Sequence, residues 1–331
     1  MTNLRFKSLG ILALAILFLT GFFWSPLNII DTHEHITSLK KAEELLKVMK
    51  TKGIVQTVLL PAPIETLTLN GNKSFTGYRE NMDEILRIAK KYPASFIPFC
   101  TISPLDEGAL EILKDCVNRG GRGLKLYNGH SLYYDIFKMP LDSPVMDPIY
   151  AYAQEQQLPI LYHVNISKYG NEFENVLKRY PNLKISVPHF MVFSTNLTRV
   201  ADLLDRYPNL YTDISFGSEP FMAAGFRRIS EHAREFQAFF ERFQDRILFG
   251  TDMVLTDFEK KDSRYMRRIL ACYRNLLEKE TFACQPVSDY YRSQKKLQQY
   301  YQSTKRLNGL DLDEDILKSV YKKNAEQFLQ R

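Results

Sequence analysis

The sequence has little of several features that mark particular protein classes. Its four cysteines include no CxxC pair, which argues against a structural zinc site of the finger type. No glycine-rich phosphate turn follows the first buried-strand pattern, which disfavours a dinucleotide-binding sheet. The basic excess is small, with 44 Lys and Arg against 38 Asp and Glu, and no basic stripe carries a binding motif. Nucleic acid is therefore not an expected partner. The cysteine spacing leaves open a disulfide between Cys272 and Cys284.

Charge is missing from one long stretch near the N-terminus. No charged residue occurs between Lys7 and Asp31, and residues 8–27 would make about 30 Å of helix, enough to cross a bilayer. Bulky residues 22–24 stand where a signal peptidase needs small ones, and basic residues precede the run. We predict that residues 1–27 form a membrane anchor with the catalytic domain on the extracytoplasmic side. The alternative is a cleaved signal segment that leaves a secreted or periplasmic protein.

The rest of the chain alternates short apolar runs with amphipathic ones. The apolar runs are residues 27–33, 54–61, 95–102, 122–128, 158–164, 183–189, 209–215 and 246–252. Helical patterns lie between them, for example at 39–50, 81–92 and 175–180. Almost wholly apolar strands that alternate with helices are typical of a parallel sheet covered on both faces, and eight of them close a barrel.

The sequence therefore predicts the α/β class and a single (β/α)8 TIM barrel over residues 28–331. A length of 331 residues and an apolar share of 45 % suit one such unit. Two departures from the alternation predict insertions at about 128–144 and 281–310, the second of them a solvated helix or a lid. An open, doubly wound sheet is the alternative fold.

Polar residues collect where the predicted strands end, which is where barrel enzymes gather catalytic groups. His33 and His35 share one face of the first strand because side chains alternate along a strand. Of the six histidines, only His130 and His232 fall elsewhere, in the fourth loop and in a helical stretch. The residues predicted to meet at the barrel mouth are His33, His35, Lys125, Tyr127, His163, His189 and Asp252.

This set of residue types is suited to a metal. Neutral imidazoles and a carboxylate bind a divalent ion that keeps one position open for water. Such an ion lowers the pKa of the water from 15.7 toward about 7, which gives a nucleophile at neutral pH. Asp252 would accept the proton and pass it to the leaving group.

The pattern resembles the metal-dependent amidohydrolase superfamily, and more closely its amidohydrolase-related branch. The resemblance rests on HxH after the first strand, Lys on the fourth, His on the fifth and sixth, and Asp on the eighth. It spans about residues 28–331 apart from the two insertions. That branch contains hydrolases alongside decarboxylases and other lyases. Supporting phrases are "GRGLKLY" at 121–127, "NLYTDIS" at 209–215, "RILFGTD" at 246–252 and "ILKSVYKKNAEQFL" at 316–329.

The resemblance implies roles for individual residues. The ligands of a first metal, with zinc the first choice, would be His33, His35, His163 and Asp252. His189 would bind a second metal or polarise the substrate. Lys125 would bridge two metals if carboxylated; as a free ammonium it would bind an anionic substrate group or pair with Asp31. We favour one ion over two.

The pocket lining departs from the branch in one place. Bulky residues 190–193 follow the sixth-strand histidine and are expected to line the pocket mouth. Tyr127 and His130, with Tyr133 and Tyr134, would add hydrogen-bonding aromatics above the metal. Asp213 would either orient a ligand histidine or simply pack.

The leading prediction is a metal-dependent hydrolase that cleaves an amide, lactone or ester bond of a small molecule. The alternatives are a non-oxidative decarboxylase or other lyase of the same fold, and a catalytically silent, membrane-anchored binding protein. Decarboxylation calls for a carboxylate clamp, and Arg122 lies at the wrong end of the fourth strand to supply it. Apart from the membrane, the expected partner is a small-molecule substrate. A homo-oligomer is compatible with the sequence but not required by it.

Overall fold

The computed structural model describes residues 28–68, 72–192, 194–258 and 261–330. The predicted anchor, residues 1–27, lies outside these residues. Among the described helices, none combines the length and the apolar character needed to span a bilayer.

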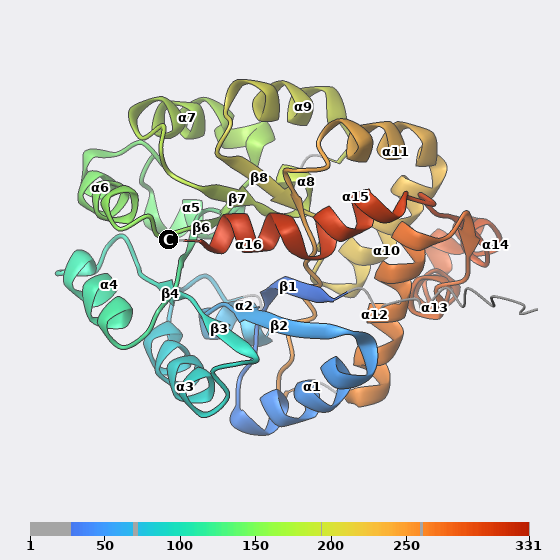
Figure 1. Cartoon of the computed structure of the whole chain (residues 1–331), viewed down its shortest axis with the longest axis horizontal. Helices are drawn as coiled ribbons and strands as arrows, with labels where there is room; N and C mark the ends of the chain where they lie inside the picture. Colours follow the sequence, from blue (N-terminus) through green and yellow to red (C-terminus); the bar gives the residue numbers. More distant parts are fainter. Residues whose placement is uncertain (1–27, 69–71, 193, 259–260, 331) are drawn as a thin grey trace, which may run out of the picture.

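A closed parallel barrel forms the centre of the chain (Figure 1). Its strands are β1 (Ile29–Glu34), β2 (Ile54–Leu59), β3 (Phe96–Pro98), β4 (Cys100–Thr101), β5 (Leu124–Gly129), β6 (Ile160–Val164), β7 (Ile185–Val187), β8 (Leu210–Asp213) and β9 (Ile247–Leu248). They pair in the orders β1-β2-β3 and β4-β5-β6-β7-β8-β9, always parallel to the next strand in the chain. The predicted third strand appears as the two pieces β3 and β4.

Backbone hydrogen bonds join the two sheets and close the barrel. Phe99 donates to Leu59 O at 2.9 Å, and the next residue, Cys100, donates to Gly123 O at 2.8 Å. On the other side, Thr32 donates to Phe249 O at 2.9 Å. The described residues therefore form the eight-stranded barrel that the alternation predicted.

Amphipathic helices surround the strands (Figure 1). They are α1 (Leu39–Lys52), α3 (Tyr78–Lys91), α4 (Ala109–Asn118), α6 (Asp147–Glu155), α7 (Ile166–Arg179), α9 (Leu197–Arg206), α10 (Glu219–Glu231), α11 (Ala233–Arg242) and α12 (Ser263–Glu278). In α9, for example, Asn196 caps the first turn, and the buried residues recur at helical spacing, as Val200 and Leu203 show. The helices thus bury one apolar stripe each against the barrel.

The C-terminal segment closes the end of the barrel at which the strands begin. It consists of α15 (Glu314–Lys318), the π-helical turn Ser319–Lys323 and α16 (Asn324–Leu329). Asn324 Nδ2 donates to Gln244 O and Ile247 O at 2.7 and 2.8 Å, at the start of β9. Phe328 packs on Tyr211 with ring centroids 5.4 Å apart. The opposite end, at which the strands finish, is left for the side chains that the sequence singled out.

Both predicted insertions contain short helices. The first holds α5 (Ser131–Phe137) and leads into the 3-10 turn Pro144–Met146. The second holds β10 (Thr281–Phe282), α13 (Gln285–Ser293), the 3-10 helix Lys295–Tyr300, α14 (Tyr301–Thr304) and β11 (Leu307–Asn308). Asn308 hydrogen-bonds Ser230 of α10, and no residue of 281–310 lines the histidine cavity described below. The lid interpretation of this insertion is therefore not supported. A further short helix, α2 (Ile64–Thr68), was not predicted.

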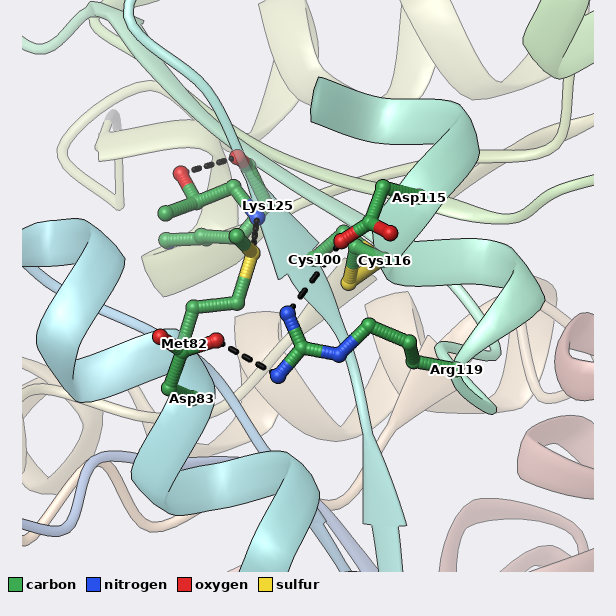
Figure 2. Close-up of a disulfide and its surroundings, with 8 residues drawn as sticks. Met82, Asp83, Cys100, Asp115, Cys116, Arg119 and Lys125 are labelled. Carbon is green, nitrogen blue, oxygen red and sulfur yellow. Dashed lines mark hydrogen bonds and ion pairs between the residues drawn. A yellow bond between two sulfur atoms is a disulfide. The ribbon is translucent and has the colours of Figure 1, made fainter. Parts of the chain in front are cut away.

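Two disulfides join helices to neighbouring segments. Cys272–Cys284, which the sequence left open, joins the interior of α12 to the residue before α13. Cys100–Cys116, which the sequence did not indicate, joins β4 to α4. Figure 2 shows this second bond beside Arg119, which bridges Asp83 and Asp115 on neighbouring helices. All four cysteines are buried, so both bonds are part of the core.

Candidate metal centre

Three buried histidines, His33, His35 and His189, are each held by a hydrogen bond at their own Nδ1 atom. His35 Nδ1 donates to Leu60 O at 2.8 Å, and His189 Nδ1 donates to Ser215 O at 2.7 Å. Since a carbonyl can only accept, Nδ1 carries the proton in both rings and Nε2 keeps its lone pair. His33 Nδ1 lies 2.8 Å from Asp213 Oδ2, which leaves its Nε2 free in the same way. All three rings are therefore prepared to ligate a metal through Nε2.

The free nitrogens surround one carboxylate. Asp252 Oδ1 lies 3.6 Å from Nε2 of His33 and 3.6 Å from Nε2 of His35, and its Oδ2 lies 3.8 Å from Nε2 of His189. Oδ1 is buried without a hydrogen-bond partner. A buried carboxylate oxygen with no donor, opposite unprotonated imidazole nitrogens, fits a divalent cation. Ligand atoms of His33, His35 and Asp252 lie within 4.8 Å of one another.

The neutral state of the imidazoles follows from their surroundings. Burial, with the nearby Lys125 second, lowers the pKa of His33 to about 3. Burial also lowers the pKa of His35 well below its ordinary value, and that of His189 below it. Neutral imidazole is the form that binds metals, so no proton has to be displaced from these three rings near pH 7.

Asp213, at the end of β8, supports this group from behind. Its Oδ1 accepts from the backbone N–H of His189 at 2.9 Å and from Ser215 N–H and Oγ at 3.0 and 2.6 Å. With Oδ2 engaged by His33, both oxygens are occupied. Of the two roles left open for Asp213, this geometry is that of a residue orienting His33 and His189.

His189 is presented by an unusual piece of backbone. From His189 to Val192, four non-glycine residues have φ values of 50–61°, so the turn α8 (Pro188–Val192) is left-handed. This turn sends Phe190 and Met191 into the core, and Phe190 packs on Phe236 and its neighbours. Only Val192 lines the pocket, and residue 193 is outside the described residues. The expectation that residues 190–193 line the mouth together is therefore wrong for Phe190 and Met191.

The backbone at Gly217 passes close to the carboxylate of Asp252. Gly217 has φ of 66°, and a Cβ built on it would lie 2.5 Å from Asp252 Oδ2. Only glycine lets the backbone after β8 come this close to the carboxylate. The predicted eighth strand, 246–252, is regular only over Ile247–Leu248, because Asp252 itself has φ of 49°.

A cavity of about 360 Å³ opens over these residues at the C-terminal end of the barrel. It contains His33, His35, Lys125, Tyr127, His130, His163, His189 and Asp252, all of them predicted. Tyr133 and Tyr134, which were also expected above the metal, do not line it: the Tyr133 hydroxyl pairs with Thr66, and the Tyr134 hydroxyl donates to Glu172. It also contains Thr66, Val192, Phe216, Gly217, Ser218, Phe221, Val254 and Lys261. Val192 was expected at the pocket mouth, and the other additional residues belong to no motif that indicated a place in the site.

His163 and His130 stand side by side in the cavity wall. Their ring centroids are 4.4 Å apart, and His163 is 5.1 Å from the ring of His189. His163 is therefore placed next to His189, outside the close group of His33, His35 and Asp252. His130 Nδ1 accepts from Leu132 N–H at 3.2 Å, so its ring proton is on Nε2. His130 is thus prepared to donate to a substrate.

Lys125 is a buried cation at the cavity wall. It is 1 % exposed, and burial lowers its pKa to about 8. Among the described residues no carboxylate lies within ion-pair distance of it, and its Nζ stands 4.9 Å from the ring centroid of Tyr127. The ion pair with Asp31 is not found, because Asp31 accepts from Thr251 N–H and Oγ1 instead.

Comparison with known proteins agrees with this architecture. The Amidohydro_2 model, which describes an amidohydrolase family, matches residues 30–331. No curated protein matches the chain. Solved structures with 12–17 % identity share the fold and have TM-scores of 0.51–0.56.

Three of these structures illustrate the range. The 4-oxalomesaconate hydratase of Rhodopseudomonas palustris has 17 % identity and a TM-score of 0.53, with coverage of 91 % of this chain and 95 % of that one. A probable 2-pyrone-4,6-dicarboxylic acid hydrolase of Acinetobacter baumannii, with citric acid bound, has 12 % identity and a TM-score of 0.56, with coverage of 92 % of this chain and 100 % of that one. The 5-carboxyvanillate decarboxylase of Sphingomonas paucimobilis has 14 % identity and a TM-score of 0.51, with coverage of 92 % of this chain and 99 % of that one.

The fold and the site define a barrel enzyme of a metal-dependent class. The chain belongs to the Amidohydro_2 family of amidohydrolases. This family includes hydrolases, hydratases and decarboxylases.

Proposed function

We propose that the protein is a metal-dependent hydrolase that uses an activated water on an ester, lactone or amide bond of a small molecule. The observation that carries the proposal is the convergence of His33, His35 and Asp252, with free Nε2 atoms facing an unpartnered Oδ1 at the wall of a cavity. These three residues would hold a divalent ion, with zinc the first choice. Such an ion supplies a Lewis acid and a water of lowered pKa when bound.

Each remaining group has a role that follows from its position. Asp252 accepts the proton of the attacking water and returns it to the leaving group. His189, with Nε2 directed to the same carboxylate, polarises the substrate or holds a second ion together with His163. His130 donates from Nε2 to a substrate oxygen. One ion is favoured over two. Only the group of His33, His35 and Asp252 includes a carboxylate oxygen that has no hydrogen-bond partner among the described residues.

The cavity favours a substrate that carries a carboxylate. Lys125 is buried, and among the described residues no carboxylate lies within ion-pair distance of it; only longer-range attraction from Asp252 and Asp213 offsets its burial, so an anion that binds beside it is favoured. Part of the wall is aromatic or aliphatic, with Tyr127, Phe221 and Val254 there. A volume of about 360 Å³ suits a small molecule. The three structural relatives are likewise named for reactions of carboxylic acids.

A second candidate is the non-oxidative decarboxylation of an aromatic or unsaturated acid. The aromatic wall favours it, because Tyr127 and Phe221 would face a flat, conjugated ring. A catalytically silent binding protein is disfavoured by the complete set of ligand and supporting residues.

A paired assay separates these functions. The purified protein would be incubated with a panel of lactones and esters of small carboxylic acids, and in parallel with aromatic acids. Acid release from the first panel that requires His33 and Asp252 supports the hydrolase. Carbon dioxide release from the second panel, with the same dependence, supports the lyase. Neither activity in metal-loaded protein, together with tight binding of an acid, would support the binding protein.

We further propose that the protein is anchored by residues 1–27 with its barrel in an extracytoplasmic compartment. Two buried disulfides support this placement, because such bonds persist in oxidising compartments. Since β1 begins at Ile29, at the end of the barrel opposite the cavity, an anchored barrel would open its site away from the membrane. The mass of the mature protein from membranes tests the anchor, and loss of about the first two dozen residues would contradict it.

A further inference from the structure

A fully buried glutamate lies on β1 between the two ligand histidines. Glu34 Oε1 accepts from the backbone N–H of His35 and of Val254, both at 2.9 Å. Its Oε2 accepts from the N–H of Met253 at 3.3 Å. One carboxyl group thus binds the amide of His35, directly after β1, and the amides of the two residues that follow Asp252.

The same two residues are held through their carbonyl groups by Lys261. Lys261 Nζ donates to Met253 O at 2.8 Å and to Val254 O at 3.2 Å. Both the N–H and the C=O groups of residues 253 and 254 are therefore bound by the side chains of Glu34 and Lys261. Lys261 also lines the cavity that contains the proposed metal ligands.

Asp252 needs such support because little else fixes it. Its φ of 49° and that of Val254, 53°, lie in the left-handed region, which non-glycine residues adopt only when their surroundings impose it. Its Oδ1 has no hydrogen-bond partner that would orient the side chain. The direction of the carboxylate must therefore be set by the backbone on either side of it. A hydrogen bond of 2.7 Å from Asp252 N–H to His33 O fixes the backbone on the N-terminal side of Asp252.

We propose that Glu34 and Lys261 form a backbone clamp that positions Asp252 as a metal ligand. Glu34 binds the amide hydrogens and Lys261 the carbonyl oxygens of residues 253–254. This inference rests on the proposed metal-dependent function. Both residues are positioning residues, since they act on the metal through Asp252.

The chain offers matched controls for both clamp residues. Glu174 is a largely buried glutamate whose carboxylate binds Arg199 and Arg206, far from the cavity. Lys184 also donates to two backbone carbonyls, Gln327 O and Gln330 O at 2.9 and 2.8 Å, at the opposite end of the barrel. Changes to these residues remove the same kinds of interaction without touching the segment after Asp252.

The test compares full-length Glu34→Gln and Lys261→Met with Glu174→Gln and Lys184→Met. Zinc affinity would be measured by chelator competition, and the geometry of the site by the absorption spectrum of the cobalt(II)-substituted protein. The clamp predicts a loss of zinc affinity of about 10–100-fold and an altered cobalt spectrum in the first pair only. With a turnover assay, kcat should fall more than KM rises in that pair.

Three results would decide the matter. Wild-type zinc affinity and an unchanged cobalt spectrum in Glu34→Gln and Lys261→Met would overturn the clamp while leaving the metal-dependent function intact. Equal losses in the control pair would also overturn it, because a general loss of stability would then explain them. A wild-type protein that takes up no metal would overturn the proposed function and the clamp with it. If Glu34→Gln fails to fold, the half-buried Lys261 still provides the comparison.

Discussion

Asp213 ends β8 and Asp252 follows the neighbouring strand β9 at the same end of the barrel, and both are buried, yet their surroundings differ. Both oxygens of Asp213 accept hydrogen bonds, from His33, His189 and Ser215. Asp252 has an oxygen with no donor at all. One carboxylate is thus satisfied by the protein, and the other is left for a ligand that the protein itself does not supply.

The acidities of the two groups follow the same division. Burial works against the charge of Asp213, but His33, His189 and the hydrogen bonds outweigh it and hold the pKa of Asp213 below its ordinary value. Burial raises the pKa of Asp252 to about 8, although Lys125 opposes it. Burial alone therefore does not determine the charge of a site residue: at Asp213 the neighbouring imidazoles and hydrogen bonds outweigh it, and at Asp252 they do not.

The largest expected effect is that of removing the unsatisfied carboxylate. Asp252→Asn should lose both metal uptake and the proton acceptor, so turnover should fall by at least the roughly 10²–10⁴-fold that a positioned acid–base group contributes. His33→Asn should abolish metal-supported turnover as well. Metal content and initial rates check both variants, and retained activity in either would remove that residue from the ligand set.

A smaller effect is expected at the satisfied carboxylate. Asp213→Asn keeps the shape but weakens the hold on His33 Nδ1, so zinc affinity should fall by about 10–100-fold while the protein still binds metal. Chelator competition measures the change. A loss as complete as that of Asp252→Asn would mean that Asp213 is itself a ligand.

Lys125, which lies near both aspartates, should act on the substrate rather than the metal. Lys125→Met should raise the KM of a carboxylate substrate by about tenfold or more, as expected for a lost hydrogen bond to a charged group. Zinc content and the KM of a neutral analogue should change little. Loss of the metal from this variant would instead indicate a carboxylated lysine that bridges two ions.

The smallest effects are opposite pH dependences of stability in the metal-free protein. The depressed pKa of Asp213 contributes stability above its unfolded value of about 3.9, and that stability is lost as the pH falls through the folded pKa. Asp252, raised to about 8, contributes stability below about pH 3.9 that is lost as the pH rises toward 8. The loss of unfolding free energy in Asp213→Asn, relative to wild type, should therefore become smaller in acid. The unfolding free energy of Asp252→Asn should rise relative to that of wild type as the pH rises. Denaturant unfolding from pH 3 to 9 measures both, and parallel curves would contradict the assignment.

The barrel and the positions of its site residues could be predicted because they depend on regular geometry. The alternation of strand side chains places His33 and His35 on one face, and parallel topology brings every strand end to the same rim. These features require only periodicity, which a sequence displays directly.

What could not be predicted depends on local departures from that regularity. The left-handed turn at His189 moved Phe190 and Met191 from the expected pocket mouth into the core. The role of Asp213 was ambiguous because orientation and packing look alike until hydrogen-bond partners are known. The Cys100–Cys116 bond joins two segments that share no motif. Lys261 lines the cavity although it lies in no motif of the site. Each of these required coordinates.

The most direct test of the central claim is the metal content per chain of full-length protein purified without chelator or added metal. We expect about one equivalent of zinc or a similar divalent ion in the wild type, and none in Asp252→Asn. A second equivalent would assign His163, His189 and a modified Lys125 to a second ion. A wild-type protein that contains no metal and takes none up on titration would overturn the proposed metal centre.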